Sequence, residues 1–382
     1  MFILEKNIME TYRMIRRMAL VVILTLVLSQ IGFGQNWNAV PGTDNLRYGI
    51  FGGAECFAVY KDVLYVGGGI RTVGDVSTGC MAKFNGKTWS AVGSGLSVGV
   101  VRCLAVYKGE LYAGGTFKAK EGNFKTKHIA RWDGKSWKSV GEGFDDRMGF
   151  DDGVFCFAEY KGDLYVGGSF VGSGAVKSRN IIKWDGGNWS SVGTEMGHFQ
   201  VVGCLMVYKD ELYLGSGSET NIGGITSVTD GIMRKWDGSK WSNMDKGVDG
   251  FVDNFYIYQD ELYVSGSFKK VGNLTVNKIA SWNGTEWKSV GSGIESGGWV
   301  TCFGEYKGEL FVGGTFKKIG GVETKYIAKW NGKSWSGVGV VDCSPSTSVS
   351  NFGVFMDELY VGGAFNKMGG VKAVDIVKWV VK

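Results

Sequence analysis

The side chains best suited to chemistry in this chain are carboxylates that gather in one segment between two apolar runs. The charged residues of this segment include Asp145, Asp146, Arg147, Asp151 and Asp152. Carboxylates at this density could hold a cation or bind a glycan, and a pair of them could act as general acid and general base on a glycosidic bond. They show no regular ligand spacing, so the alternative is a solvated acidic loop.

Two isolated side chains extend this predicted binding site. Trp299 follows Gly297 and Gly298 in a segment that connects two repeats of the chain, and His198 lies in another connecting segment. An aromatic ring in a glycine-rich loop is a candidate for contact with a ligand, because functional side chains concentrate on loops held by a rigid scaffold.

The sequence predicts neither a bound metal nor a cofactor. It contains only two histidines, His128 and His198, and no CxxC pair or other metal-ligand spacing. It also lacks a phosphate-binding glycine loop, a dinucleotide fingerprint and a Gly-x-Ser-x-Gly elbow. We expect His128 to be a surface or packing residue.

The elements that position the candidate residues are indicated by a sequence pattern that recurs about every fifty residues. Its clearest mark is an aromatic residue at the end of an apolar run, found seven times, at Tyr60, Tyr107, Tyr160, Tyr208, Tyr258, Tyr306 and Phe355. Repeats of this length are typical of propellers, in which each unit buries its apolar face against its neighbours. The sequence therefore predicts an all-β, seven-bladed β-propeller over residues 36–382.

The second repeat shows what one blade should contain. Short apolar runs at residues 101–107, 111–115, 128–132 and 137–140 are separated by turns that bear glycine. The last turn, Asp133-Gly134, accepts positive φ and is a strong hairpin signal. We expect each repeat to form a four-stranded antiparallel meander.

A glycine pair such as Gly114-Gly115, followed by two spaced aromatics such as Trp132 and Trp137, recurs through the chain. This pattern resembles the kelch repeat, and the string LYVGG…IAKWNGKSW is similar to secreted kelch-like propellers that include the cortical marker family. The resemblance covers residues 36–382. It implies a fold similar to the central domain of galactose oxidase but no particular activity, and the two histidines argue against the copper centre of that enzyme. A WD40 assignment is weaker. Trp-Asp pairs occur in this chain, but a second Trp follows each of them at once.

The seventh repeat ends at Trp379–Lys382 and lacks a fourth strand. Residues 36–42 match the fourth strand of the first repeat, which begins at Trp89. We therefore expect the strand at Trp37 to pair with the strand that holds Trp379. Closing the ring in this way removes two open sheet edges.

Five cysteines share one repeat position, four residues before the terminal aromatic. They are Cys56, Cys103, Cys156, Cys204 and Cys302, whereas Cys80 and Cys343 lie elsewhere. We expect buried thiols, because a disulfide needs Cα atoms about 4.4 to 6.8 Å apart and equivalent positions on neighbouring blades are usually farther. Oxidation in an exported protein stays open. The tryptophans other than Trp299 are expected to fill the space between blades, with a sugar-stacking array as the alternative.

Residues 1–35 have the pattern of a secretory signal peptide. Arg16 and Arg17 precede the apolar stretch Met18–Leu28, and small residues follow. A membrane anchor, the alternative, needs about 20 apolar residues. We therefore expect no membrane span after cleavage and a secreted, periplasmic or cell-surface protein. The net charge of +5 gives no electrostatic footprint for nucleic acid.

The predicted function is binding without catalysis, by an exported monomer that contacts a protein or polysaccharide through one loop-rich face. Lysines on opposing loops, such as Lys118 and Lys269, would give this face mixed charge. The alternative is a polysaccharide-active hydrolase or lyase, in which carboxylates such as Asp146 and Asp152 converge on the axial pocket. A purely structural spacer is a third hypothesis.

Overall fold

The computed structural model describes residues 37–43, 47–48, 53–96, 99–121, 124–145, 152–193, 201–217, 233–244, 247–338 and 348–380. Residues Trp37–Val380 form one compact unit; a second unit, Met1–Asn36 with Val381–Lys382, lies outside these ranges. The predicted signal peptide therefore also lies outside them. No helix among the described residues is long and apolar enough to cross a membrane.

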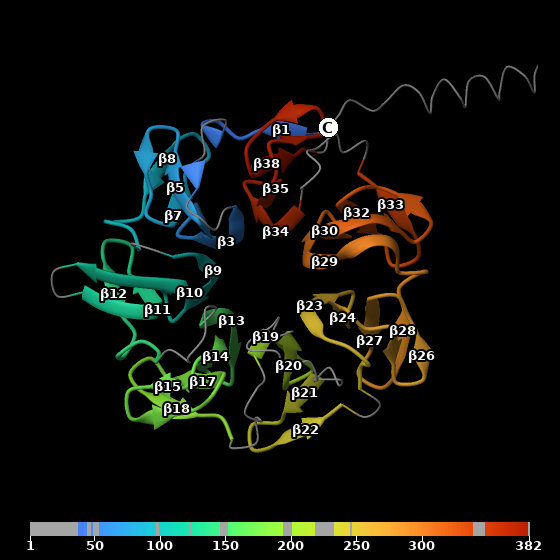
Figure 1. The fold of residues 1–382 in the computed structure, drawn as a ribbon, viewed down its shortest axis with the longest axis horizontal. Coiled ribbons are helices and arrows are strands. Elements are labelled where there is room, and N and C mark those ends of the chain that lie inside the picture. The colour runs from blue at the N-terminus through green and yellow to red at the C-terminus, as the bar shows by residue number, and fades with distance from the viewer. Residues whose placement is uncertain are drawn as a thin grey trace, which may run out of the picture. The chain divides into compact units, whose positions relative to one another are not determined.

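The described chain is all-β and forms seven four-stranded antiparallel blades around a common axis, as predicted (Figure 1). The strands of the first three blades, from the axis outward, are β3 (Ala54–Tyr60), β4 (Val63–Gly68), β7 (Met81–Phe84) and β8 (Trp89–Ala91); β9 (Val101–Tyr107), β10 (Glu110–Glu121), β11 (Phe124–Trp132) and β12 (Trp137–Ser139); and β13 (Gly153–Tyr160), β14 (Asp163–Ser169), β17 (Ile181–Trp184) and β18 (Trp189–Ser191). Those of the next three are β19 (Val201–Tyr208), β20 (Glu211–Gly217), β21 (Met233–Trp236) and β22 (Trp241–Asn243); β23 (Val252–Tyr258), β24 (Glu261–Gly266), β27 (Ile279–Trp282) and β28 (Trp287–Ser289); and β29 (Ile294–Tyr306), β30 (Glu309–Ile319), β32 (Ile327–Trp330) and β33 (Trp335–Gly337).

The seventh blade joins both ends of the described chain. It consists of β34 (Ser348–Phe355), β35 (Glu358–Ala364), β38 (Ile376–Trp379) and β1 (Trp37–Ala39). Strand β1 pairs with β38 so that Trp37 lies opposite Trp379, and their rings meet at 4.8 Å between centroids. The predicted closure by the N-terminal strand is confirmed, and β1 lies beside β38 in Figure 1.

Short hairpins that the sequence analysis did not predict follow the second strand of several blades. They are β5 (Ile70–Val73) with β6 (Val76–Ser77), β15 (Gly172–Ser173) with β16 (Val176–Lys177), β25 (Lys270–Val271) with β26 (Leu274–Thr275), and β36 (Lys367–Met368) with β37 (Val371–Lys372). Strand β2 (Arg47–Tyr48) pairs with β5, and β31 (Val322–Glu323) pairs with β30. Each hairpin reverses at a glycine of positive φ, for example Gly174.

The hydrophobic core lies between blades. One buried cluster, for example, combines Tyr107 and Tyr112 of the second blade with Val154, Leu164 and Trp184 of the third. The fourth-strand tryptophans link blades further, because the indole N–H of Trp137 donates to the carbonyl of Val92 at 2.8 Å. This placement agrees with the predicted packing role of the repeated tryptophans.

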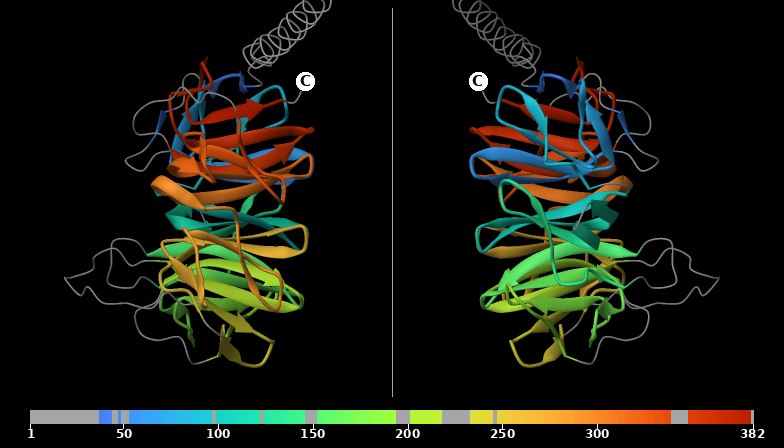
Figure 2. Two further views of the ribbon diagram at one scale, coloured as in Figure 1. Left: turned by 90° about the vertical axis from the view of Figure 1, so that its right-hand side faces the viewer. Right: turned by 90° about the vertical axis from the view of Figure 1, so that its left-hand side faces the viewer.

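All inner strands run in the same direction, so the propeller has two distinct faces, seen from the side in Figure 2. We call the face where the inner strands begin the loop face and the face where they end, at hairpin turns, the turn face. At the turn face, each inner-strand tyrosine of the first six blades donates its hydroxyl to a turn carbonyl of the next blade; the pairs are Tyr60 to Gly109, Tyr107 to Gly162, Tyr160 to Asp210, Tyr208 to Asp260, Tyr258 to Gly308 and Tyr306 to Asp357.

A lysine reinforces several of these junctions. Lys161 lies with its ammonium group 5.0 Å from the centroid of the Tyr160 ring and donates to the carbonyl of Asp237 in the next blade at 2.9 Å. The junction between the seventh and first blades differs, because Phe355 and Met356 occupy these two positions. Phe355 has no hydroxyl to donate, and Met356 is 62% exposed beside Gly86.

Candidate functional site

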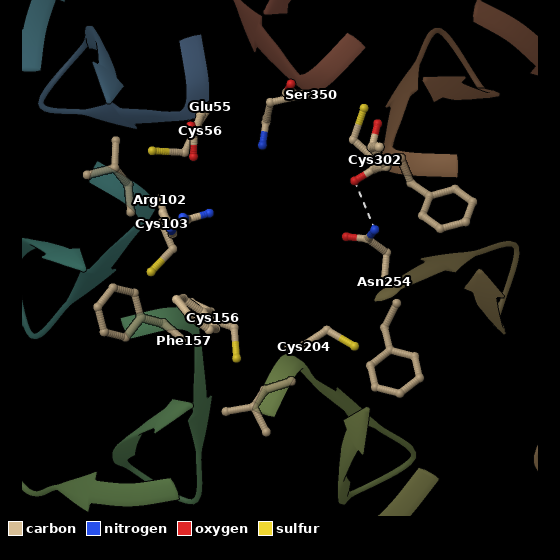
Figure 3. Close-up of a pocket in the computed structure, with 18 of the residues that line it drawn as sticks. Glu55, Cys56, Arg102, Cys103, Cys156, Phe157, Cys204, Asn254, Cys302 and Ser350 are labelled. Carbon is tan, nitrogen blue, oxygen red and sulfur yellow. Dashed lines mark hydrogen bonds between the residues drawn. The ribbon is translucent and has the colours of Figure 1, made fainter. Parts of the chain in front are cut away.

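A cavity of about 350 Å³ lies on the propeller axis and is lined by the inner strands of all seven blades (Figure 3). Its lining is mixed. It includes charged Glu55 and Arg102, aromatic Phe155 and Tyr256, and the hydroxyl of Ser350. A concave site of this composition, with a few polar groups among apolar ones, is the usual form of a small-ligand site.

The same irregularity in each inner strand brings side chains to this cavity. In every blade the ladder between the first and second strands skips one residue of the first strand, which is a β-bulge. We call the seven skipped residues the bulge ring: Glu55, Arg102, Phe155, Gly203, Asp253, Thr301 and Ser350. All of them except Asp253 are among the residues that line the cavity.

The second glycine of each glycine pair makes the bulge sterically possible. A Cβ atom on Gly168 would overlap the carbonyl oxygen of Gly153, and one on Gly314 would overlap the carbonyl oxygen of Trp299. At these two positions the bulged strand approaches its partner so closely that a Cβ atom would clash, whereas the fourth blade has the same bulge with Ser216 at the equivalent position. The glycine pair that resembles the kelch pattern therefore has a defined mechanical role.

The first glycine of the pair leaves room for the repeated cysteine. A Cβ atom on Gly67 would lie 2.7 Å from Sγ of Cys56 and 2.6 Å from Cγ1 of Val101 in the next blade. The Cys56 thiol faces the carbonyl of Val101 at 3.5 Å. Asn254 fills the same position in the fifth blade and donates to the carbonyl of Thr301 at 2.8 Å, so both residue types connect neighbouring blades.

These thiols are structural groups. Burial raises the pKa of Cys56, Cys103 and Cys204 well above the ordinary value, so their reactive thiolate forms are suppressed at neutral pH. The described cysteines are free thiols, of which Cys103 and Cys156 are only partly buried and the others are buried. Cys343 lies outside the described residues.

The charges of the bulge ring are unevenly placed around the axis. The guanidinium of Arg102 lies 5.3 Å from the centroid of the Phe155 ring in the next blade, a cation–π arrangement. Asp253 lies on the fifth blade, where burial raises the pKa of its carboxyl to about 6. Asp253 occupies the bulge of β23, a strand that begins at Val252.

Trp299, predicted to lie in a loop, is instead part of strand β29. The strand extends past the bulge because β29 and β30 continue to pair beyond Val300. The side chain of Trp299 is 51% exposed, two residues before the bulge residue Thr301. Lys278 lies beside it, with Nζ 6.0 Å from the ring centroid and 2.8 Å from the carbonyl oxygen of Gly298. Trp299 thus stands at the loop face, close along the strand to the cavity.

The acidic segment is only partly described, and its described members do not line the cavity. Asp145 forms an exposed ion pair with Lys177 at 3.3 Å. Asp152 is buried and accepts a hydrogen bond from Ser169 at 3.2 Å, so it is not the solvated residue of the alternative interpretation. The other predicted members, Asp146, Arg147, Asp151 and His198, lie outside the described residues. No group of three His, Cys, Asp or Glu among the described residues could hold a metal ion.

His128, expected at the surface or in packing, is buried, and Nδ1 lies 3.2 Å from the carbonyl oxygen of Gly115. His128 has a positive φ at the point where the third strand becomes regular. Asn180 and Tyr326 have positive φ at the equivalent positions of their blades. His128 is therefore a packing residue.

Sequence reasoning missed the bulge ring, although a signal was present. The residue between the repeated small apolar residue and the cysteine or asparagine is a different amino acid in every repeat, for example Arg102 between Val101 and Cys103. A position that varies while both neighbours repeat is not required by the architecture, and this marks it as a candidate for function.

Comparison with known proteins supports the fold. No family model matches the chain, and no curated protein matches it. Among solved structures, it is similar to the extracellular domain of a B. thetaiotaomicron protein described as a one-component system, with a TM-score of 0.55 and 9% sequence identity. The match covers 92% of this chain and 40% of that one, so the chain spans less than half of that structure. At this identity the similarity concerns the fold alone.

Proposed function

We propose that this chain is an exported, monomeric binding module of the kelch-like type, without catalysis of its own, whose loop face and axial cavity bind a glycan. The observation that carries the proposal is the bulge ring, whose residue type changes from blade to blade and of which six members, all except Asp253, line a single cavity. If these positions served packing alone, the residue type would not be expected to vary among equivalent positions of the blades.

The arrangement suits a sugar better than a large apolar ligand. Phe155 and Tyr256 offer aromatic faces, and Glu55 and Ser350 offer hydrogen-bonding groups to hydroxyls. Trp299 adds an exposed ring at the loop face, where a sugar outside the cavity could stack. Export is supported by the pattern of residues 1–35, and an extracellular structural neighbour is in keeping with it.

The test is a glycan array probed with the mature protein, followed by titration of the best ligand against Trp299→Ala. We expect at least about tenfold weaker binding with an unchanged melting temperature, because an exposed ring contributes little to folding. Val106→Ala is the matched control, since Val106 is 46% exposed near the opposite end of an inner strand. A blank array combined with capture of one exported protein would replace the glycan by a protein partner and overturn the proposal.

A further inference from the structure

Trp299 occupies a position that recurs in every blade, directly before the small apolar residue of the inner strand. The equivalent residues of the other blades are Gly53, Val100, Gly153, Val201, Phe251 and Ser348. A residue as small as glycine satisfies the fold at this position, so packing does not require an indole here. The Trp299 side chain is 51% exposed, which leaves its ring accessible at the loop face.

The backbone beneath this ring is held from two sides. Gly298 and Trp299 together oppose Thr315 of β30 in a β-bulge, and the N–H of Trp299 donates to Oγ1 of Thr315 at 3.2 Å. From the fifth blade, Nζ of Lys278 donates to the carbonyl oxygen of Gly298 at 2.8 Å. An aromatic ring on a strand fixed in this way is a preorganised surface on which a sugar can stack.

Lys278 also places a positive charge beside the ring. Its Nζ lies 6.0 Å from the centroid of the Trp299 ring. An ammonium group has three N–H donors, so it can hold the Gly298 carbonyl and an oxygen of a ligand at the same time. Hydrogen bonds from an ammonium group to a carboxylate are roughly twice as strong as those between neutral groups. The pair therefore favours a ligand that carries a carboxylate next to a stacking ring.

Lysines dominate the loop face around this pair. The described loop-face segments of the fifth and sixth blades are residues 247–251, 267–278, 291–299 and 315–325. Their six lysines are Lys269, Lys270, Lys278, Lys317, Lys318 and Lys325. Their three acidic residues are Asp249, Glu295 and Glu323. Glu295 forms an ion pair with Lys318 at 3.2 Å, and Asp249 accepts hydrogen bonds from two backbone N–H groups at 2.7 Å. The excess of positive charge, six minus three, attracts an anionic ligand.

We propose that Trp299 and Lys278 form a binding site for an acidic sugar, in which a uronic acid ring stacks on the indole and its carboxylate binds Nζ of Lys278. This inference rests on the proposed glycan-binding function and specifies its ligand class. A uronic acid carries its carboxylate on the sugar ring itself, so one ring meets both groups. The axial cavity gives no such preference, because its lining contains one carboxylate, Glu55, and one guanidinium, Arg102.

The experiment compares ligands that differ in this charge alone. The trimers of galacturonic acid and of glucuronic acid, each with its methyl ester, are titrated calorimetrically into the mature protein at pH 7. We expect an acid trimer to bind at least about tenfold more tightly than its ester, because esterification removes the anion. Added salt should weaken binding of the acid and leave that of the ester nearly constant. An ester that binds as tightly as its acid would overturn the inference and leave the proposed function intact.

Variants assign the effect to residues. Lys278→Gln should weaken binding of the acid trimer at least about tenfold and leave binding of the ester unchanged, because glutamine keeps a donor for Gly298 but has no charge. Trp299→Ala should weaken binding of both by a similar factor, since stacking does not depend on the carboxylate. Lys177→Gln is the matched control, because it removes the same charge from the loop face of the third blade, where Lys177 pairs with Asp145 at 3.3 Å.

Each remaining outcome decides the inference. Unchanged binding of the acid trimer in a folded Lys278→Gln variant would overturn the assignment, and if this variant does not fold, the comparison with the ester and the effect of salt decide. If neither acid trimer binds, a glycan array with hits confined to sugars without an acidic group would reject the ligand class, whereas hits among other acidic sugars would support it. A blank array would reject the proposed function itself.

Discussion

A buried carboxylate raises the free energy of the folded state whenever it is ionised, and Asp253 is such a group. Burial raises its pKa to about 6 from an ordinary value of 3.8. The Cys204 thiol is a titratable neighbour, whose own pKa is raised by burial and, to a smaller extent, by Cys156 and Asp253. The carboxyl group thus gains nothing from this neighbour.

We predict that Asp253→Asn stabilises the protein at neutral pH. Because the folded-state pKa lies above the unfolded one, the folded state binds the proton more tightly, and stability falls as pH rises from about 4 to 6. Above pH 6 the full cost is present, roughly 2–3 kcal/mol as an upper limit. Thermal unfolding should show a higher melting temperature for Asp253→Asn at pH 7.5 and almost no difference at pH 4. A difference that does not change with pH would contradict the explanation.

At the residue scale, the sequence predicted the packing residues well and the cavity residues poorly. The repeated tryptophans were correctly expected between blades, since a residue type that recurs at one position reflects the architecture. The repeated cysteines were expected as buried thiols, and Cys56, Cys204 and Cys302 are buried. Arg102 and Phe155 do not recur, and a bulge is set by hydrogen bonds across two strands, so their place in the cavity lining could not be read from composition. Trp299 was expected in a loop but lies in strand β29.

At the scale of the strand, the glycine pair and the β-bulge depend on each other. The first glycine accommodates a thiol and a valine of the next blade, and the second allows the inner strand to approach the second strand at the bulge. The bulge in turn adds one residue that belongs to neither face of the blade and reaches the axis. Removing the second glycine should therefore affect both stability and the cavity.

We predict that Gly168→Ala destabilises the propeller by about 3 kcal/mol or more, because its Cβ atom would overlap the carbonyl oxygen of Gly153 and backbone cannot easily move aside. Urea unfolding would measure the change. Gly187→Ala in the same blade is the control, since its Cβ atom would approach only a side-chain oxygen of Asp185, at 3.6 Å. A loss of stability in Gly187→Ala as large as in Gly168→Ala would show that the overlap is not the cause.

The strand order of a blade was predictable because Asn-Gly and Asp-Gly tips mark the last turn of the meander. The short hairpin β15–β16 was not, since Gly172–Ser173 and Val176–Lys177 are too short for any periodicity to emerge. Strand β11 was also expected to start at His128 but begins at Phe124, because pairing with β10 continues beyond the bulged region. Polar residues such as Lys125 and Lys127 hide this extension from a hydrophobic pattern.

For the whole molecule, the junctions between blades are nearly identical except where the ring closes. The tyrosine hydroxyl bond spans the first six junctions, and lysines such as Lys161 strengthen several of them. Phe355 and Met356 replace this pair at the junction of the seventh and first blades. This junction consequently depends on apolar packing at the turn face, where Met356 lies beside Gly86.

We predict that the double substitution Phe355→Tyr with Met356→Lys stabilises the propeller by about 1–2 kcal/mol. By equivalence with the other junctions, the new hydroxyl should reach the carbonyl of Asp62 and the new ammonium group that of Asn85; a hydrogen bond contributes about 1 kcal/mol net and an exposed cation–π contact about 0.5–1. Equilibrium unfolding tests this, with Tyr208→Phe as the reverse control, expected to lose about 1 kcal/mol. An unchanged free energy of unfolding in the double variant would contradict the idea that this junction is the weakest.

The number of blades and the closing strand could be predicted from the sequence, because each blade leaves its own signature and residues 36–42 match the fourth strand that the seventh repeat lacks. The position of the cavity follows from ring symmetry, but its chemistry does not. What a propeller binds depends on seven unrelated side chains at one level of the axis, and no periodic pattern relates them.

The pairing of β1 with β38 also fixes an order of events during biosynthesis. Strand β1 is synthesised before the other strands of the propeller, yet its partner β38 is the last of them, so the seventh sheet stays incomplete until the whole propeller has been made. During that interval the nascent protein exposes open strand edges, which are prone to associate with other chains. A protein of this design should therefore need a chaperone that shields its early segments, and premature termination should leave an aggregating fragment.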